Sequence, residues 1–342
     1  MTLEFSHSAG QKPAIWWWGL LVLSAAGLVF APALLDMAIQ LDISIIFVFA
    51  LLALSMSFLW GYAGILSFGQ TIFFGLGGYS YAVVMMNTGS GSMAVVCGIA
   101  IPMLFAALLG YFMIYGRISD IYLSVMTLVV TLIFEKVIRS TSGPEYVIGS
   151  VRLNGQNGIP GIPGLSLPWT GGAPLSIEGI FYLAGGLLLL VYVALRLGLT
   201  TRFGRVIVGI RENERRMALL GYDTRFYKLM AFVIAGAVAG LSGVLYALWG
   251  AFVGPEMFNL NQAAQVVIWV IVGGRSVLIG PIIGAGIVQY LSTWLGTVGV
   301  GQVTLILGGV LMVFVLVFPR GLLPTLGDLG RWIARRTKSE GT

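Results

Sequence analysis

Long apolar runs separated by short polar stretches dominate this sequence. A helix needs about 20 predominantly apolar residues to cross the hydrocarbon core of a membrane, and ten runs approach that length. We expect helical spans near residues 14–35, 43–60, 71–86, 93–115, 121–137, 177–195, 229–252, 264–279, 281–295 and 303–318. Several runs are short, which leaves broken or fully buried helices open as an alternative. The pattern predicts an all-α, polytopic membrane protein with about ten transmembrane helices.

The composition agrees with this class of protein. Hydrophobic residues make up 58% of the chain and charged residues 9%, whereas a soluble domain carries about 25% charged residues. The sequence has one histidine, His7, and one cysteine, Cys97, so we expect no metal site and no histidine-based catalytic triad. Paired catalytic carboxylates do not stand out either, which argues against a membrane-bound enzyme.

One polar segment, residues 196–228, interrupts the apolar pattern, and we call it the polar island. It contains eight arginine and lysine residues. A centrally placed arginine or lysine disfavours membrane insertion by roughly 2.5–3.5 kcal/mol. We therefore expect the polar island to lie in water, and its excess of positive charge places it on the cytoplasmic side.

The centre of the polar island, residues 211–221, predicts a short surface helix. Glu212 can pair with Arg216 at helical spacing, and Gly221 is a suitable C-cap. Two apolar residues three positions apart would form a small stripe on one side, Met217 and Leu220. So short a helix is marginal in water by itself. Two interpretations stay open, an ordinary solvated connector and a docking helix for a cytoplasmic partner.

The distribution of charge also predicts the topology. With the polar island inside, the spans on either side of it return both termini to the cytoplasm. This gives a cytoplasmic N-terminal segment, a transmembrane domain interrupted by an external loop and a cytoplasmic loop, and a basic cytoplasmic tail. Their respective residues are 1–13, 14–319, 140–176, 196–228 and 320–342. Lys136 and Arg139, at the outer end of the fifth span, depart from the pattern.

Two glycine-rich stretches, residues 61–80 and 273–286, lie in the two halves of the chain. Segments interrupted by glycine often flank the translocation path of a transporter, and the alternative is close helix packing through small residues. The positions that we expect to face a path are Gly64, Ser67, Gln70, Thr71, Gly75, Gly273 and Gly274. The placement of the two stretches also hints at an internal repeat.

Two further features have open alternatives. Glu135 lies four residues before Arg139, so a local ion pair competes with an intramembrane proton or substrate site. In the external loop, glycine and proline alternate over residues 154–165, which predicts irregular, turn-rich structure. That loop is either a platform for an extracytoplasmic partner or a simple tether.

The chain has no phosphate-binding loop of the ATPase type. Such a loop places a lysine directly after a glycine, and none of the four lysines follows one: Lys12, Lys136, Lys228 and Lys338. We therefore expect no cofactor in this chain. If transport is driven by ATP, partner subunits bind it.

Three stretches resemble a known family. They read GYAGILSFGQTIFFGLGGY at residues 61–79, NGIPGIPGL at 157–165 and GRVIVGIRENERRMALLGYDTRFYKLMAFVIAGAVAGLSGVLYA at 204–247, with a shorter match, GPIIGA, at 280–285. They are similar to the inner-membrane permease subunits of ATP-binding-cassette importers for branched-chain amino acids. The resemblance covers roughly residues 40–325. Many members have histidine where this chain has Gln70, and members that import urea or short amides share the overall pattern.

The resemblance implies a permease like those of type II importers, in a bacterial inner membrane. It implies a second homologous permease subunit, two cytoplasmic ATPase subunits and a periplasmic solute-binding protein as partners, besides the surrounding lipid. It also assigns the polar island as the helix that couples to the ATPase, with contacts from Arg211, Glu212, Glu214, Arg215, Met217 and Gly221. The alternatives are a urea or short-amide importer and a stand-alone secondary carrier that depends on Glu135.

Overall fold

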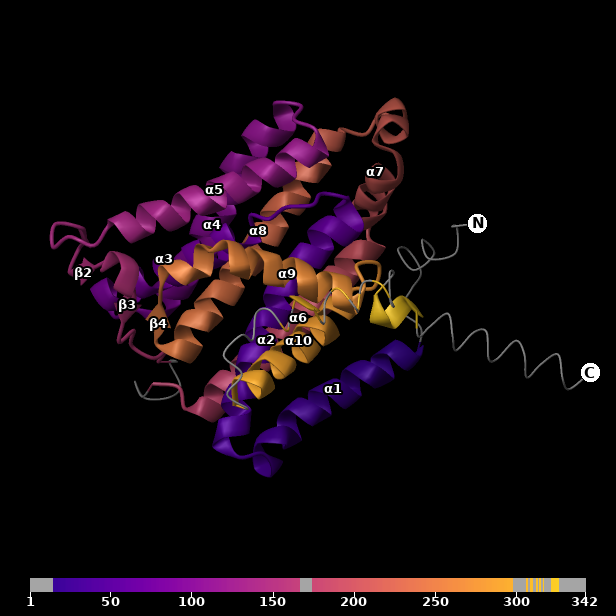
Figure 1. Ribbon diagram of the computed structural model, residues 1–342. Coiled ribbons are helices and arrows are strands. Elements are labelled where there is room, and N and C mark those ends of the chain that lie inside the picture. The colour runs from indigo at the N-terminus through magenta and orange to yellow at the C-terminus, as the bar shows by residue number, and fades with distance from the viewer. Residues whose placement is uncertain are drawn as a thin grey trace, which may run out of the picture.

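The computed structural model describes residues 15–166 and 174–297, together with a few positions between 306 and 325 (Figure 1). The predicted N-terminal segment 1–13 lies outside the described residues. So do most of the last predicted span, 303–318, and most of the basic tail, 320–342. The predictions for these three segments stay predictions.

Helices make up most of the described chain. They are α1 (Ile15–Leu34), α2 (Met37–Ser57), α3 (Gln70–Thr88), α4 (Gly91–Tyr115), α5 (Asp120–Ser140), α6 (Ile177–Thr200), α7 (Arg202–Leu219), α8 (Thr224–Gly250), α9 (Leu260–Gly273) and α10 (Gly280–Thr297). The side chains of Ser176, Asp223 and Asn259 accept backbone hydrogen bonds at the starts of α6, α8 and α9, as N-caps do. The prediction of a helical protein is confirmed.

Five of the described helices are long and apolar enough to cross a membrane. They are Met37–Tyr62, Gly91–Tyr115, Asp120–Ser140, Ile177–Thr200 and Thr224–Gly250. The first of them is α2 extended by a π-helical turn, η2 (Phe58–Tyr62). Shorter apolar helices occupy Leu21–Leu34 and Leu260–Gly273. A total of about ten transmembrane helices stays a prediction.

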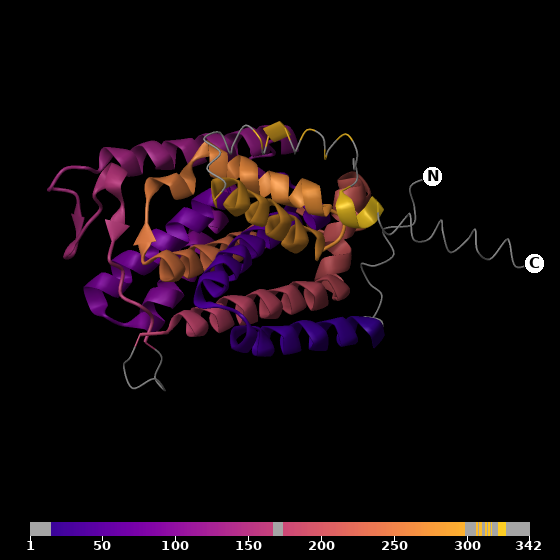
Figure 2. The ribbon, with the colours of Figure 1, turned by 60° about the horizontal axis from the view of Figure 1, so that its bottom comes forward.

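The helix α2 lies at the centre of the bundle. In an apolar stretch of 18 residues within this helix, 78% of the residues are buried inside the protein. The corresponding share is 28% for α4 and 22% for α5. The helix α2 contacts α6, α8, α9 and α10, while α1 lies along α6 at the periphery (Figure 2). The outward faces of α4 and α5 are apolar and exposed, which suits contact with lipid tails.

Glycine brings α3 and α8 into backbone contact. A Cβ atom at Gly77 would clash with the carbonyl of Gly240, and one at Gly243 would clash with the carbonyl of Phe74. Small residues allow such close approach between helices in a membrane. Tight packing, the alternative that the sequence left open, therefore applies to this part of the first glycine-rich stretch.

The boundary between α9 and α10 differs from the prediction. The sequence predicts spans over residues 264–279 and 281–295, but α9 ends at Gly273 and α10 begins at Gly280. Gly274 has a φ of +101°, which a helix does not accommodate. The intervening residues form a turn, and α9 is shorter than an ordinary span.

The external loop contains short strands. The strand β1 (Val147–Ile148) pairs with β2 (Val151–Arg152), and β3 (Ile159–Pro160) pairs with β4 (Phe252–Val253), which follows α8. A 3-10 turn, η3 (Gly155–Asn157), joins the two regions. The strands and α7 lie at opposite ends of the bundle (Figure 1). This is the arrangement that the predicted topology requires of the external loop and the polar island.

Candidate functional site

The polar island forms α7, which is bent at Asn213. The φ of −161° and ψ of 95° at this residue are extended rather than helical. Its Oδ1 accepts a hydrogen bond from the backbone N–H of Arg216 at 2.9 Å, as the N-cap of a new helix does. We call the short helix after the bend, residues 214–219, the coupling segment, after the role that the family resemblance predicts for it.

The bend corrects the prediction of one continuous helix over residues 211–221. The carboxylate of Glu212 pairs with Arg211, and no ion pair joins it to Arg216 in the described structure. A pairing four residues apart requires an unbroken helical turn. The extended residue Asn213 breaks that turn.

The apolar side chains of the coupling segment differ in their exposure. The side chain of Met217 lies over Gly209, in the part of α7 before the bend. Leu219 is 83% exposed and Leu220 66% exposed. Leu219 and Leu220 are therefore the largely exposed apolar pair of this segment, and the stripe of Met217 and Leu220 stays a prediction.

Gly221 ends the coupling segment. Its φ is +86°, its N–H donates to the carbonyl of Ala218, and the N–H of Tyr222 donates to the carbonyl of Met217. This pair of hydrogen bonds is the Schellman motif, which favours glycine. The predicted C-cap is confirmed, and its role is to turn the chain back toward α8.

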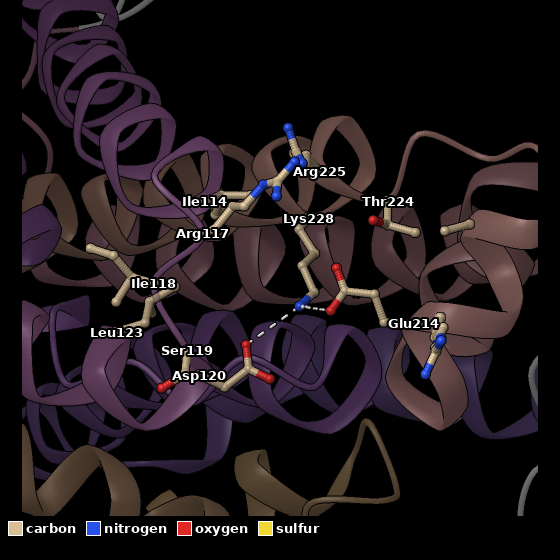
Figure 3. Close-up of a pocket in the computed structure, with 12 residues that line it drawn as sticks. Ile114, Arg117, Ile118, Ser119, Asp120, Leu123, Glu214, Thr224, Arg225 and Lys228 are labelled. Atoms are coloured by element: carbon tan, nitrogen blue, oxygen red, sulfur yellow. Dashed lines mark hydrogen bonds and ion pairs between the residues drawn. The ribbon is translucent and has the colours of Figure 1, made fainter.

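Lys228 of α8 connects the coupling segment to the bundle. Its Nζ lies 2.6 Å from Glu214 Oε2 and 3.4 Å from Asp120 Oδ1 (Figure 3). The lysine side chain is only 13% exposed, and a cation so far withdrawn from water needs anionic partners. Asp120 begins α5, so one ammonium group joins the coupling segment, α8 and α5. Neither Asp120 nor Lys228 stands out as a site residue in the sequence.

A cleft of about 540 Å³ surrounds this ion-pair network. Residues from the end of α4, the start of α5, the coupling segment and the start of α8 line it. They are Ile114, Arg117, Ile118, Ser119, Asp120, Leu123, Glu214, Arg215, Ala218, Thr224, Arg225 and Lys228. The predicted coupling residues Glu214 and Arg215 thus share a cleft, whereas Arg211 and Glu212 lie on the other side of the bend.

Arg211 joins the polar island to the first glycine-rich stretch. Its guanidinium donates a hydrogen bond to the carbonyl of Gly61. Gly64 has a φ of +78°, and a Cβ atom there would lie 2.8 Å from Arg211 Cγ. The close approach therefore requires glycine, both for space and for backbone conformation. The structure brings together two groups of predicted residues, coupling and path, that lie far apart in the sequence.

The second glycine-rich stretch also contacts Gly61. The backbone carbonyl of Arg275 packs on Gly61 so closely that no Cβ atom fits there. The guanidinium carbon of Arg275 lies 5.4 Å from the ring centroid of Trp60, which is a cation–π contact. Trp60 and Gly61 both belong to the π-helical turn η2. An irregularity of this kind often marks a functional site.

The chain between η2 and α3 is not helical. Residues 64–69 form an irregular, largely buried segment, and hydroxyl groups of α5 complete its backbone hydrogen bonds. Ser124 Oγ donates to the carbonyl of Leu66 at 2.8 Å, and Thr127 Oγ1 accepts from the N–H of Phe68 at 3.1 Å. Buried backbone groups need such partners. We call residues 64–69 the unwound segment.

The α5 hydroxyls are a further group of site residues, which was not predicted from the sequence. Ser124, Thr127 and Thr131 follow one another at intervals of three and four residues in the apolar middle of α5, and all three are buried. That spacing places them on one face. A polar stripe of this kind was the signal that would have found them.

The predicted path residues Ser67, Gln70 and Thr71 are all buried. Gln70 Oε1 accepts a hydrogen bond from Ser55 Oγ at 3.2 Å. The amide nitrogen of Gln70 has no hydrogen-bond partner among the described residues. A buried donor without an acceptor is unusual in a folded protein.

The other predicted path positions are sites of close packing. A Cβ atom at Gly75 would clash with the ring of Phe258, and one at Gly273 with the carbonyl of Gly280. Gly274 supplies the positive φ that ends α9. These placements give no direct contact with an open path in the described structure. Their role in transport stays a prediction.

Glu135 forms the local ion pair that its spacing allows. Its carboxylate lies 2.9 Å from Arg139 Nε, and the two side chains are 13% and 35% exposed. The pair belongs to one face of the last turns of α5. It therefore needs no partner from another helix to compensate the charge of Glu135.

Comparison with known proteins gives a consistent result. Residues 42–316 match a family described as "Branched-chain amino acid transport system / permease component". The chain is 29% identical over 302 residues to the high-affinity branched-chain amino acid transport system permease protein LivM of Escherichia coli (strain K12), which covers 81% of this chain and 68% of that protein. The LivM protein of Salmonella typhimurium is 28% identical over the same shares of both chains.

More distant similarity extends to sugar permeases. The ribose import permease protein RbsC of Escherichia coli (strain K12) is 27% identical over 140 residues, which is 39% of this chain and 43% of that protein. No solved structure gives a significant match.

Proposed function

We propose that this chain forms half of a translocation path for branched-chain amino acids in an ATP-driven importer. The proposal starts from the family match: the chain belongs to the family of permease components of branched-chain amino acid transport systems. The chain is a membrane-embedded transport component and not an enzyme. The solute is part of the proposal and is supported by the similarity to two LivM proteins.

The proposal includes the partners. A second homologous permease completes the path, two cytoplasmic ATPase subunits bind the ATP, and a periplasmic binding protein delivers the solute. Both termini and the polar island lie in the cytoplasm, and the external loop with its paired strands faces the binding protein. The excess of basic residues in the polar island supports this orientation.

The coupling segment is the proposed contact with an ATPase subunit. It is short, it projects from the bundle next to α8 (Figure 1), and it exposes Leu219 and Leu220 together with charged side chains. An exposed apolar pair on a charged helix suits insertion into a groove of a partner. The predicted contacts Glu214 and Arg215 are also exposed.

The observation that carries the proposal is the contact of Arg211 with Gly61 and Gly64. Through this contact, a displacement of α7 by the ATPase reaches the unwound segment directly. Lys228 provides a parallel connection to α5, whose hydroxyls hold the same unwound segment. Rigid-body motion of packed elements is a common way of passing a change between sites.

The unwound segment and Gln70 are the proposed wall of the path. Non-helical backbone at membrane depth is tolerated where protein buries it or where it lines a cavity, and broken helices recur at the binding sites of transporters. The unpartnered amide nitrogen of Gln70 is a donor that gains an acceptor when a polar solute passes.

The experiment is uptake by cells that carry the whole importer and lack other carriers of its solutes. We expect labelled leucine, isoleucine or valine to accumulate, and unlabelled branched-chain amino acids to compete more strongly than urea or acetamide. Competition by urea or acetamide alone would replace the solute and leave the importer assignment in place. A chain that transports without any ATPase subunit would contradict the importer itself.

The stand-alone carrier is tested with Glu135→Gln. In an ATP-driven importer, this change removes only the local pair with Arg139, so we expect uptake to be retained. Loss of ATP-independent transport in this variant would favour the carrier. The matched control is Glu178→Gln, in the first turn of α6, outside the span of Glu135.

A further inference from the structure

We propose that the cleft beside the coupling segment binds the phosphate group of an anionic membrane phospholipid through Arg117 and Arg225. The cleft opens between the turn that joins α4 to α5 and the first turn of α8. This inference requires only that α4, α5 and α8 cross a membrane. It does not depend on the solute or on the proposed partners.

The charges in the cleft call for an anion. Four cationic side chains and two carboxylates line it: Arg117, Arg215, Arg225 and Lys228, with Asp120 and Glu214. Both carboxylates pair with Lys228. The three arginines form no ion pair in the part of the chain that the structure describes. Positive charge therefore remains in the cleft after the internal pairs are made.

The two arginines at the rim are well placed for one ligand. Figure 3 shows the side chains of Arg117 and Arg225 extending to the same rim of the cleft, away from the pair of Lys228 and Glu214. The guanidinium carbon of Arg225 lies 6.0 Å from the ring centroid of Tyr115. A guanidinium that stacks on a ring keeps the N–H donors at its edge for a phosphate, which it can bind in bidentate fashion.

The surroundings favour a lipid over an acidic protein segment. Tyr111 stacks on Tyr115 with 4.9 Å between ring centroids, so an aromatic column leads from Arg225 along the outer face of α4. Tyr111, Phe112 and Tyr122 are 53%, 65% and 69% exposed on the two sides of the turn that contains Arg117. Tyrosine gathers at membrane interfaces, and basic pockets between helices bind lipid headgroups. A phospholipid uses both features, because its phosphate meets the arginines and its acyl chains meet α4 and α5.

The test is native mass spectrometry of the full-length chain, purified within its complex and titrated with phosphatidylglycerol or phosphatidylcholine. We expect phosphatidylglycerol to remain bound at concentrations where phosphatidylcholine does not. The double variant Arg117→Gln with Arg225→Gln should weaken retention of phosphatidylglycerol by roughly tenfold or more, because one charge-assisted hydrogen bond already corresponds to about tenfold in an equilibrium constant. Arg117→Lys with Arg225→Lys should retain part of the binding.

The matched control is Arg202→Gln. Arg202 also lies 6.0 Å from a tyrosine ring, that of Tyr222, but it does not line the cleft. Its substitution should leave lipid retention unchanged. Inorganic phosphate in large excess distinguishes a site for a lipid headgroup from a site for the free phosphate ion. We expect it not to displace phosphatidylglycerol, because free phosphate cannot reproduce the contacts of the acyl chains.

Three outcomes would overturn the proposal. One is equal retention of the two lipids by the unaltered protein. Another is equal lipid retention in the double variant and in Arg202→Gln. The third is displacement of phosphatidylglycerol by inorganic phosphate, which would make this a site for the free anion.

Discussion

The ammonium group of Lys228 lies 2.6 Å from a carboxylate oxygen of Glu214. The pair ties the exposed coupling segment to the second turn of α8, and the second contact of Lys228, with Asp120, extends the connection to α5. One side chain therefore connects the coupling segment to two helices of the bundle, in parallel with the contact between Arg211 and Gly61.

Substitution of this lysine should uncouple transport. In Lys228→Met, we expect ATP hydrolysis by the assembled importer to persist while uptake falls about fivefold, which corresponds to about 1 kcal/mol for an ion pair partly screened by solvent. Lys228→Arg should retain most of the uptake. A double-mutant cycle with Glu214→Gln should be non-additive, and additive effects would contradict the connection.

Gly64 should not tolerate a side chain. In Gly64→Ala, the positive φ alone disfavours the native backbone by about 1–2 kcal/mol, and the new Cβ atom would meet Arg211. We expect a lower melting temperature and impaired uptake. The control is Gly186→Ala in α6, where nothing lies within 4 Å of an added Cβ atom and alanine is the better helix former. Equal stability of the two variants would argue against a constraint at Gly64.

We expect Leu219 and Leu220 to be required for docking of the ATPase subunits. Leu219→Asp with Leu220→Asp places two charges where we propose an apolar contact, so ATPase subunits should no longer co-purify with the chain. Both side chains are largely exposed, and the thermal stability of the membrane domain should change little. Leu219→Met with Leu220→Met preserves the apolar surface and should preserve the complex. Co-purification with the aspartate variant would place the contact elsewhere.

Substitution of Gln70 should lower the rate of uptake without lowering the stability of the protein. In Gln70→Leu, the loss of the Ser55 hydrogen bond is offset by removal of an unpartnered buried amide nitrogen, so the melting temperature should stay nearly the same. We expect uptake to fall by roughly tenfold, the effect of about 1.4 kcal/mol, because the path loses its polar group. Gln70→His, which keeps a donor, should transport better than Gln70→Leu. Unchanged uptake in Gln70→Leu would remove Gln70 from the path.

The sequence by itself determined the features that depend on local composition. The runs of apolar residues fixed the positions of most helices, because a span must be apolar throughout its length. The excess of arginine predicts that the polar island lies in water. The glycine at position 221 fixed the end of the coupling segment, since the cap needs a positive φ.

The tertiary structure decided which of these segments meet. Helical periodicity predicted that Glu212 would pair with Arg216, but the bend at Asn213 broke that register. Lys228 pairs with Asp120 of α5 and with Glu214 across the turn at Gly221. No local pattern encodes a contact between residues so far apart. The unwound segment depends likewise on hydroxyls of α5. Long-range contacts depend on how the helices pack, and packing follows the shape of the whole bundle rather than any one run of residues.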